Sequence, residues 1–513
     1  MFRVGFKSRK EQAVVPHRAK SVTVSPDMNP TESSRRQFLR TVCGMGVSLL
    51  PSAAQTPQKR PNIIYIMSDD HAAHAISAYG SKINQTPNID RIAKEGMKLA
   101  NCFCTNSICT PSRACILTGQ YSHINGVKTL ADTLDPKRNH VAKMLRNAGY
   151  QTAMVGKWHL VSDPEGFDYW NILPGQGLYH NPVMIEMGKR TTLQGYATDL
   201  IADISLDFIS KRDKSKPFFV MCHHKAPHRP WQPDAKHADM YKDKDIPEPD
   251  NLYDDYSNRS NAAKNATLRV GENFNRTDVK GDLPPLKGNE MRKWAYQVYM
   301  KDYLRCVASV DDNVGKILDY LDKENLAKDT IIIYTSDQGF FLGDHGWFDK
   351  RFIYEESLRM PFLVRYPGHI KPGSVRDEMV LNIDFAPTFL DFADVKADSG
   401  MQGVSARGIL EGKKPKKWRE TMYYRYWMHL ADHGVAAHYG VRSKRYKLIY
   451  YYGEALGTKG SINKPTAPEW EFFDLQKDPR EMRNAYEDKS YAKVIAGLKV
   501  ELIKLRRQYG DNA

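Results

Sequence analysis

The sequence has 513 residues, more than one hydrophobic core usually supports, so two domains are expected. Hydrophobic residues make up 41% and charged residues 26%, as in an ordinary soluble enzyme, and no apolar run reaches the roughly 18 residues of a membrane-spanning helix. The net charge of +15 favours an anionic partner. We do not predict that this anionic partner is nucleic acid, because the sequence has no zinc-finger spacing, RNP-like aromatic pattern or bZIP-like basic helix.

The N-terminus, residues 1–54, has the order of parts found in an export signal. Residues 34–39 (Ser-Arg-Arg-Gln-Phe-Leu) resemble the twin-arginine motif, residues 42–50 are weakly apolar, and residues 52–54 (Ser-Ala-Ala) offer a small-residue cleavage site. The alternative is a disordered basic tail. We expect an exported protein, periplasmic or secreted.

The first predicted strand ends in two adjacent acids. Residues 61–67 form a short apolar run behind a proline, typical of a buried parallel strand, and lead into Ser68, Asp69 and Asp70. One acid at this place is often a helix N-cap. Two adjacent acids repel each other unless they share a cation, which favours a metal site at the strand end.

Residues 109–119 place a cysteine, a proline and an arginine directly before an apolar helix start, after a predicted helix over residues 88–96. They read C-x-P-S-R-x-x-x-L-T-G, with the reactive side chains at Cys109 and Arg113. A free cysteine in a loop usually behaves as a small buried hydrophobe. The tight grouping with proline and arginine favours a reactive site instead.

Two later strands end in basic side chains. The strand over residues 149–156 leads to Lys157 and His159, which point the same way if the backbone stays extended; alone, such a pair is more often ordinary surface. The strand over residues 217–222 is followed by three histidines, at positions 223, 224 and 228. Interspersed prolines and the lack of a nearby acid or cysteine argue against zinc, so we predict an anion and proton-transfer loop.

A second acidic strand end repeats the first. Residues 330–335 form a β-branched strand that leads into Ser336, Asp337 and Gln338. Two such ends on neighbouring strands offer four oxygen ligands, which suit Ca²⁺ or Mg²⁺ better than zinc. The loop that follows carries more polar groups, including Lys350, toward the same edge.

Other segments complete the predicted organisation. The polar stretch over residues 231–289 is either a substrate lid or a disordered insert, and residues 294–321 have helical periodicity. Residues 396–513 differ in their predicted secondary structure: they contain antiparallel strands rich in aromatic residues and a final amphipathic helix. The predicted fold is α/β: a mostly parallel sheet between helices, residues 58–395, followed by a smaller α+β subdomain that contains an antiparallel sheet, residues 396–513.

The motif at Cys109 resembles the signature of the type I sulfatases, in which this cysteine is oxidised to formylglycine. The resemblance covers most of residues 58–395 and extends to Phe472-Phe473-Asp474-Leu475 in the C-terminal part. It implies an alkaline-phosphatase-like fold. Within the family, the chain is similar to bacterial exported glycan sulfatases, including those that resemble N-acetylglucosamine-6-sulfatase and iduronate-2-sulfatase.

The resemblance also assigns roles to individual residues. The implied ligands of Ca²⁺, with Mg²⁺ as an alternative, are Asp69, Asp70, the modified Cys109, Asp337 and Gln338. Many sulfatases have Asn where this chain has Gln338, whose reach is longer. The implied contacts to the sulfate are Arg113, Lys157 and Lys350, and the implied proton-transfer residues are His159 and His228.

The function implied is hydrolysis of sulfate monoesters, on a sulfated glycan or its monosaccharide units, by a formylglycine hydrate and a divalent metal. A sulfated substrate also accounts for the basic charge. A formylglycine-generating enzyme is the implied maturation partner. Two alternatives stay open: a formylglycine-dependent phosphodiesterase or phosphonate hydrolase, and a non-catalytic binder of sulfated glycans in which Cys109 remains a thiol.

Overall fold

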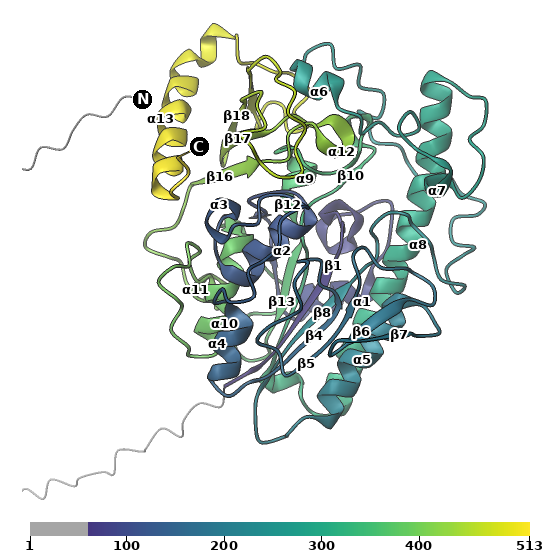
Figure 1. Ribbon diagram of the computed structural model, residues 1–513, viewed down its shortest axis with the longest axis vertical. Coiled ribbons are helices and arrows are strands. Elements are labelled where there is room, and N and C mark those ends of the chain that lie inside the picture. The colour runs from purple at the N-terminus through teal and green to yellow at the C-terminus, as the bar shows by residue number, and fades with distance from the viewer. Residues whose placement is uncertain (1–59, 513) are drawn as a thin grey trace, which may run out of the picture. The chain divides into compact units, whose positions relative to one another are not determined.

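The computed structural model describes residues 60–512 (Figure 1). The predicted export segment, residues 1–54, lies outside the described residues. Between residues 60 and 512, no helix combines the length and apolar character needed to cross a membrane. Gln58–Ala513 forms one unit by its internal contacts, and the boundary at residue 395 stays a prediction.

A ten-stranded sheet organises the larger part of the chain, in the order β14-β2-β13-β9-β1-β8-β4-β5-β6-β7. The neighbours β9, β1, β8, β4 and β5 run parallel, whereas β13 and the β6–β7 hairpin run antiparallel to the strands beside them. The strands are β1 Asn62–Ser68, β2 Met97–Leu99, β4 Gln151–Lys157, β5 Tyr169–Leu173, β6 Val183–Glu186, β7 Lys189–Thr192, β8 Phe218–His224, β9 Thr330–Ser336, β13 Phe362–Arg365 and β14 Ser374–Arg376. The predicted fold class is confirmed.

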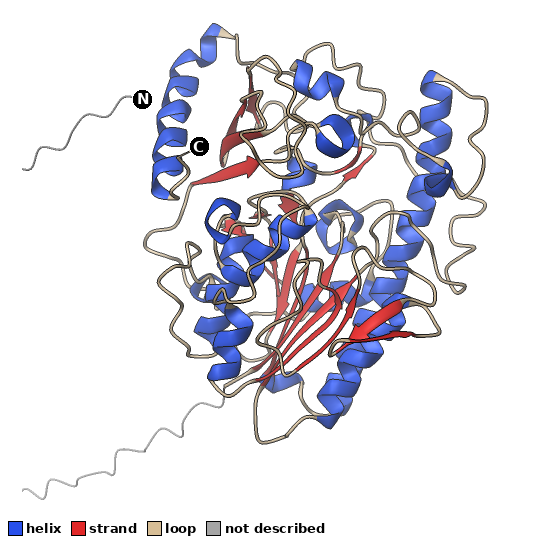
Figure 2. Ribbon diagram, in the orientation of Figure 1, coloured by secondary structure: helices blue, strands red, loops and turns tan. Residues whose placement is uncertain are grey.

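Helices cover both faces of this sheet (Figure 2), and β1 shows why. Ile63, Tyr65 and Met67 belong to one buried apolar cluster, whereas Ile64 and Ile66 belong to another. Successive side chains of a strand point to opposite faces, so a strand apolar at every position needs a helix layer on each side. One layer contains α2 Cys109–Thr118, α4 Val141–Asn147 and α10 Phe385–Phe392; the other contains α1 Pro87–Lys94, α5 Ala197–Lys211 and α8 Gly288–Lys323.

The strand register places the predicted site residues together. Ser68, the last residue of β1, lies opposite His224 of β8 on one side and Ser336 of β9 on the other. The chains that leave these parallel strands therefore emerge at the same edge of the sheet.

A four-stranded antiparallel sheet forms most of the C-terminal part, with α13 Ala492–Gln508 packed against it. Its strands are β16 Thr421–Tyr426, β17 His438–Ser443, β18 Tyr446–Tyr451 and β19 Glu469–Asp474. The remaining short elements are β3 Cys102–Phe103, β10 Phe341–Leu342, β11 Phe348–Asp349, β12 Arg359–Met360, β15 Val380–Leu381, α3 Ser122–Asn125, α6 Asn261–Asn265, α7 Arg276–Val279, α9 Glu355–Leu358, α11 Arg407–Leu410 and α12 Ala431–Gly434.

A buried ionic network ties this smaller sheet to α9. Arg442 donates to both carboxylate oxygens of Glu355, at 2.8 and 3.0 Å. Lys447 reaches the same carboxylate at 3.0 Å and Glu481 at 2.6 Å. All four side chains are buried, so each charge depends on its partners rather than on water.

His345 links the long polar stretch over residues 231–289 to α9. The His345 ring lies 3.5 Å from Asp254 of this stretch and 3.7 Å from Glu356. Burial disfavours the charged imidazole, but these two carboxylates raise its pKa to about 9.

This pKa predicts a pH-dependent contribution of His345 to stability. A raised histidine pKa stabilises the fold fully below the unfolded pKa of about 6.5, and the contribution is lost as pH rises through about 9. The 2.5-unit difference corresponds to about 3 kcal/mol. Urea unfolding of wild type and His345→Gln at pH 6 to 10 should show their difference in unfolding free energy shrinking with rising pH. A difference that stays constant would contradict the prediction.

Candidate active site

Three buried carboxylates meet at the shared edge of β1 and β9. Asp69 and Asp70 follow β1, Asp337 follows β9, and one oxygen from each lies within 4.8 Å of the others. Burial and the neighbouring carboxylates raise the pKa of Asp70 to about 7. They raise the pKa of Asp337 to about 6. A cation between the three would remove this repulsion.

Gln338 completes a set of oxygen donors. Its Nε2 donates to Asp70 Oδ1, while its buried Oε1 has no hydrogen-bond partner among residues 60–512. Carboxylate and amide oxygens are the ligands of hard cations. Asp69, Asp70, Asp337 and Gln338 therefore fit Ca²⁺ or Mg²⁺, as the strand ends predict.

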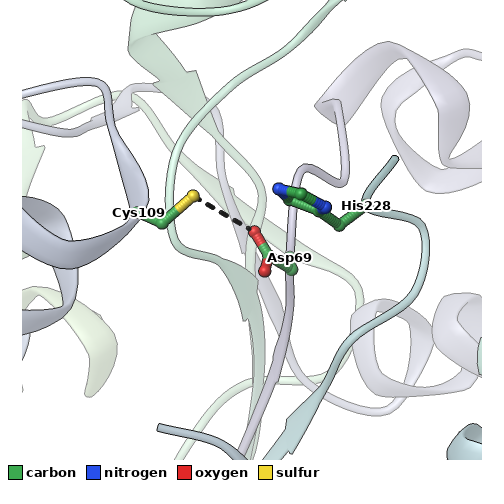
Figure 3. Close-up of side chains that lie close together, drawn as sticks. All are labelled: Asp69, Cys109 and His228. Carbon is green, nitrogen blue, oxygen red and sulfur yellow. Dashed lines mark hydrogen bonds between the residues drawn. The ribbon is translucent and has the colours of Figure 1, made fainter. Parts of the chain in front are cut away.

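Cys109 begins α2 and faces this acidic cluster. Its Sγ lies 3.7 Å from Asp69 Oδ1. Figure 3 shows Asp69 between the Cys109 sulfur and the imidazole of His228. Burial raises the pKa of the Cys109 thiol to about 12, so the encoded side chain is a protonated thiol at neutral pH.

Arg113 lies one helical turn after Cys109 and therefore on the same face of α2. Its Nε and Nη2 contact Asp337 Oδ2 at 3.0 and 2.9 Å, and Nη2 lies 3.4 Å from Asp69 Oδ2. One buried guanidinium thus joins the acids of both strand ends. Although burial opposes the charge, Asp337 and Asp69 raise the arginine pKa.

Two lysines approach the cluster from different strands. Lys157, at the end of β4, contacts Asp69 Oδ2. Gly156 precedes it with a φ of 98°, and a Cβ there would clash with the backbone oxygen of His223. Lys350 Nζ lies 2.7 and 2.8 Å from the two oxygens of Asp70. Burial opposes the charge on Lys350, but Asp349 and Asp70 raise its pKa well above the usual range.

The two predicted proton-transfer histidines contact different residues of the site. His159 Nδ1 is 3.3 Å from the Thr110 hydroxyl, next to Cys109. His228 donates from Nδ1 to the backbone oxygen of Arg229 at 2.6 Å, which leaves Nε2 free to face Asp70 at 3.7 Å. Burial and Lys157 lower both pKa values, that of His159 to about 2. Both rings are neutral near pH 7.

A cavity of about 360 Å³ opens over these groups. Among the predicted residues, it is lined by Cys109, His228 and Lys350. Its other walls are polar and largely charged, comprising Gln176, Arg229, Asp349, Arg351, Asp432 and His433, together with Ile108 and Leu130. A concave site of this size with converging charges suits a small, polar, anionic ligand.

Two family models together match residues 61–508. The model described as Sulfatase matches residues 61–395. The chain belongs to the sulfatase family. A second model, described as N-sulphoglucosamine sulphohydrolase, C-terminal, matches residues 343–508 of this sulfatase.

The relatives of this sulfatase agree with that assignment. It is 42% identical to an N-acetylglucosamine-6-O-sulfatase of Bacteroides thetaiotaomicron, over 98% of this chain and 96% of the relative. It is 28% identical to an arylsulfatase of Clostridium perfringens, over 87% and 94%. The solved structure of BT4656 with its substrate D-glucosamine-2-N,6-O-disulfate is 44% identical and covers 88% of this chain and 99% of that one, with a TM-score of 0.84. The sulfatase is a sulfuric ester hydrolase, as predicted.

The structure of this sulfatase brings all ten predicted site residues to one edge of the sheet and corrects one local expectation. His223 and His224 lie inside β8 and are buried, rather than in a loop. Sequence reasoning did not single out Arg351 and Gln176 of the cavity wall. Arg351 follows Lys350 directly and could have been weighed with it, whereas Gln176 has no sequence signal.

Tyr303 of α8 positions the loop after β1, which carries the candidate metal ligands Asp69 and Asp70. Its hydroxyl accepts from Ala72 N and donates to the backbone oxygen of Asp70, both at 2.9 Å. Its ring stacks on Phe340, three residues after Asp337, with centroids 5.9 Å apart. Tyr303 therefore contacts the segments that follow both β1 and β9. One of these contacts is to Asp70, which has a left-handed conformation with a φ of 64°.

The Tyr303→Phe variant is expected to bind a divalent cation, Ca²⁺ or Mg²⁺, about 10-fold more weakly, because residues behind metal ligands typically contribute that much. Calorimetric titration of the metal-free protein measures this directly. Tyr320→Phe, on the same helix but only half-buried, is the matched control and should leave the affinity unchanged. Equal affinities in wild type and Tyr303→Phe would contradict the positioning role.

Proposed function

We propose that this sulfatase removes the 6-O-sulfate of a glucosamine or N-acetylglucosamine unit, with Cys109 converted to formylglycine and Ca²⁺ as the metal. The observation that carries the proposal is the nearly full-length likeness to an N-acetylglucosamine-6-O-sulfatase. The fitted oxygen donors at the ends of β1 and β9 support the metal, and the flanking sequence of Cys109 supports its oxidation.

The charges around the site suit a sulfate monoester. Its negative oxygens repel a nucleophile until positive groups neutralise them. Arg113, Lys157 and Lys350 hold three fixed positive groups around Cys109. Ca²⁺, when held by Asp69, Asp70, Asp337 and Gln338, would add Lewis-acid stabilisation of the same charge. Formylglycine at position 109 would supply, as its hydrate, the oxygen nucleophile.

The two histidines divide the proton transfers. His228 is held through Nδ1 by the Arg229 carbonyl, so Nε2 is the atom that delivers a proton to the departing sugar oxygen. Burial and the charge of Lys157 lower the pKa of His228 in the free enzyme, and the negative charge of a bound sulfate ester would oppose that effect. His159, beside Thr110, accepts the proton whose removal releases sulfate from residue 109.

The far wall of the cavity supplies groups that suit a sugar ring. Arg351 Nε contacts Asp349 Oδ1 at 3.1 Å, and His433 Nε2 lies 3.5 Å from Asp349 Oδ2. A carboxylate held between a guanidinium and an imidazole can pair with sugar hydroxyls as acceptor and donors together. The cavity volume suits one sugar unit at a chain end rather than the interior of a polymer.

We infer that residues 1–54 direct export and that the enzyme works in the periplasm or outside the cell. The Arg-Arg pair at positions 35 and 36 supports a twin-arginine route. A variant with Arg35→Lys and Arg36→Lys should stay in the cytoplasm. Fractionation of cells that express it would detect the protein there. Unchanged export of that variant would refute the route.

Coexpression with a formylglycine-generating enzyme provides the decisive test. Peptide mass should show the aldehyde at position 109, and ion chromatography should detect sulfate released from N-acetylglucosamine-6-sulfate or glucosamine-2-N,6-O-disulfate. The panel should include a galactosamine-6-sulfate, an iduronate-2-sulfate and a phosphodiester. Preferred turnover of the phosphodiester would instead support the phosphodiesterase alternative, and preferred release from another sugar would refute the proposed substrate.

A further inference from the structure

The encoded thiol of Cys109 belongs to a second donor set, distinct in chemistry from the four oxygens. Cys109, Asp69 and His228 each direct one ligand atom toward the others, and all three atoms lie within 4.8 Å of one another (Figure 3). Sulfur and imidazole nitrogen are ligands of zinc and cobalt, whereas Ca²⁺ and Mg²⁺ prefer oxygen.

The spacing of two of these atoms already matches a zinc site. A tetrahedral zinc bonded to sulfur at about 2.3 Å and to oxygen at about 2.1 Å sets those two atoms about 3.6 Å apart. Cys109 Sγ and Asp69 Oδ1 lie 3.7 Å apart. Because the three atoms lie within 4.8 Å, the imidazole would have to move by no more than about 1.4 Å to complete the set.

The neighbours of these residues orient them as metal ligands. His228 donates from Nδ1 to the backbone oxygen of Arg229 at 2.6 Å, so its Nε2 carries the free lone pair. Such a bond from the other ring nitrogen accompanies most metal-bound histidines. Lys157 and Arg113 occupy Asp69 Oδ2, which leaves Oδ1 directed at the sulfur.

The charge around the sulfur becomes more negative when the thiol ionises. The buried acids Asp69, Asp70, Asp337 and Asp349 are at least matched in number by the buried bases Arg113, Lys157, Lys350 and Arg351. The thiolate formed on binding adds one negative charge. A divalent cation neutralises that charge.

We propose that the unmodified protein binds one Zn²⁺ through Cys109 Sγ, Asp69 Oδ1 and His228 Nε2. Binding forms a zinc–sulfur bond and releases the thiol proton to solvent, with no change of oxidation state. Cys109 and His228 both line the cavity, so the fourth position faces it and takes water or a small anion. The site exists only while residue 109 is a thiol, because conversion to formylglycine oxidises the Cβ to an aldehyde and removes the sulfur ligand.

Cobalt tests the proposal in the full chain made without a formylglycine-generating enzyme and freed of metal by chelation. Titration with Co²⁺ should produce a near-ultraviolet thiolate-to-cobalt band that saturates at one ion per chain, and added Zn²⁺ should remove it. Cys109→Ser should lack the band. Cys115→Ser should keep it, since Cys115 lies on the same helix with Thr105, Ser122 and Asn125 around its sulfur.

The outcomes separate this inference from the proposed function. A band that persists in Cys109→Ser, or no band in the wild-type thiol at saturating Co²⁺, would overturn the zinc site. His228→Gln should weaken cobalt binding at least 10-fold while circular dichroism stays unchanged; unaltered affinity would remove His228 from the ligand set. Sulfate release by the formylglycine form is measured on a different protein species, so either result can fail alone.

Discussion

In the Cys109→Ser variant, sulfate release is expected to fall by about 10⁴-fold or more, while the fold and Ca²⁺ binding persist. Serine can accept a sulfuryl group, but the resulting ester has no second hydroxyl from which sulfate can be expelled. The side chain is also similar in size to cysteine, and Asp69, Asp70, Asp337 and Gln338 keep their positions. The loss should therefore appear in turnover rather than in stability.

Sulfate release under multiple-turnover conditions measures this loss, with peptide mass to exclude an aldehyde at position 109. Cys115→Ser is the matched control, because it alters a buried cysteine of α2 outside the cavity wall. It should retain activity whenever Cys109 is oxidised. Sustained turnover by Cys109→Ser without an aldehyde would refute the proposed nucleophile.

The Lys447→Met variant is expected to lose about 3–5 kcal/mol of unfolding free energy, the usual cost of leaving a buried charge without its partner. Glu481 would lose its 2.6 Å contact, and Glu355 would keep Arg442 but lose the lysine. Glu355 would keep Arg442 and Arg359, whereas Glu481 would lose the one cation that the described residues place within 4 Å of it. Denaturant unfolding at pH 7 measures the difference.

A nearby exposed pair provides the control for this network. Lys444 lies 3.5 Å from Asp377, with both side chains largely in water. Lys444→Met should change stability by less than about 1 kcal/mol. The Lys447→Met, Glu481→Gln double variant should recover part of the loss, because it removes the unpaired charge as well. Equal effects of the Lys444 and Lys447 single variants would show that burial does not govern these pairs.

Much of the catalytic edge could be predicted because it follows from strand chemistry. A buried parallel strand is apolar at every position, so the acids at 69, 70 and 337 stand out as its end. The register that sets Ser68 opposite Ser336 turns two similar sequence endings into one site. The spacing of Cys109 and Arg113 needs only one helical turn to put both side chains on one face.

The remaining parts of the site depend on long-range side-chain contacts, which no local sequence pattern predicts. His433 of α12 contacts Asp349, more than 80 residues earlier in the chain; Asp432 and His433 of α12 and Leu430 just before it all have positive φ. The Glu355–Lys447 pair likewise joins α9 to β18. Long-range pairs of this kind are set by how the two sheets pack, and the sequence on either side of each residue gives no signal of its partner.

Because the cysteines are buried, the rate at which their thiols are alkylated measures local opening of the structure. Within residues 60–512, all six cysteines are buried and unpaired with each other. Apart from Cys109, which lines the cavity, an alkylating reagent can reach them only when the surrounding structure opens, so their labelling rates report local opening, in the manner of amide exchange. Cys306 reports on α8, Cys222 on β8 and Cys115 on α2. The chain thus carries its own set of native probes, one for each layer of the α/β fold.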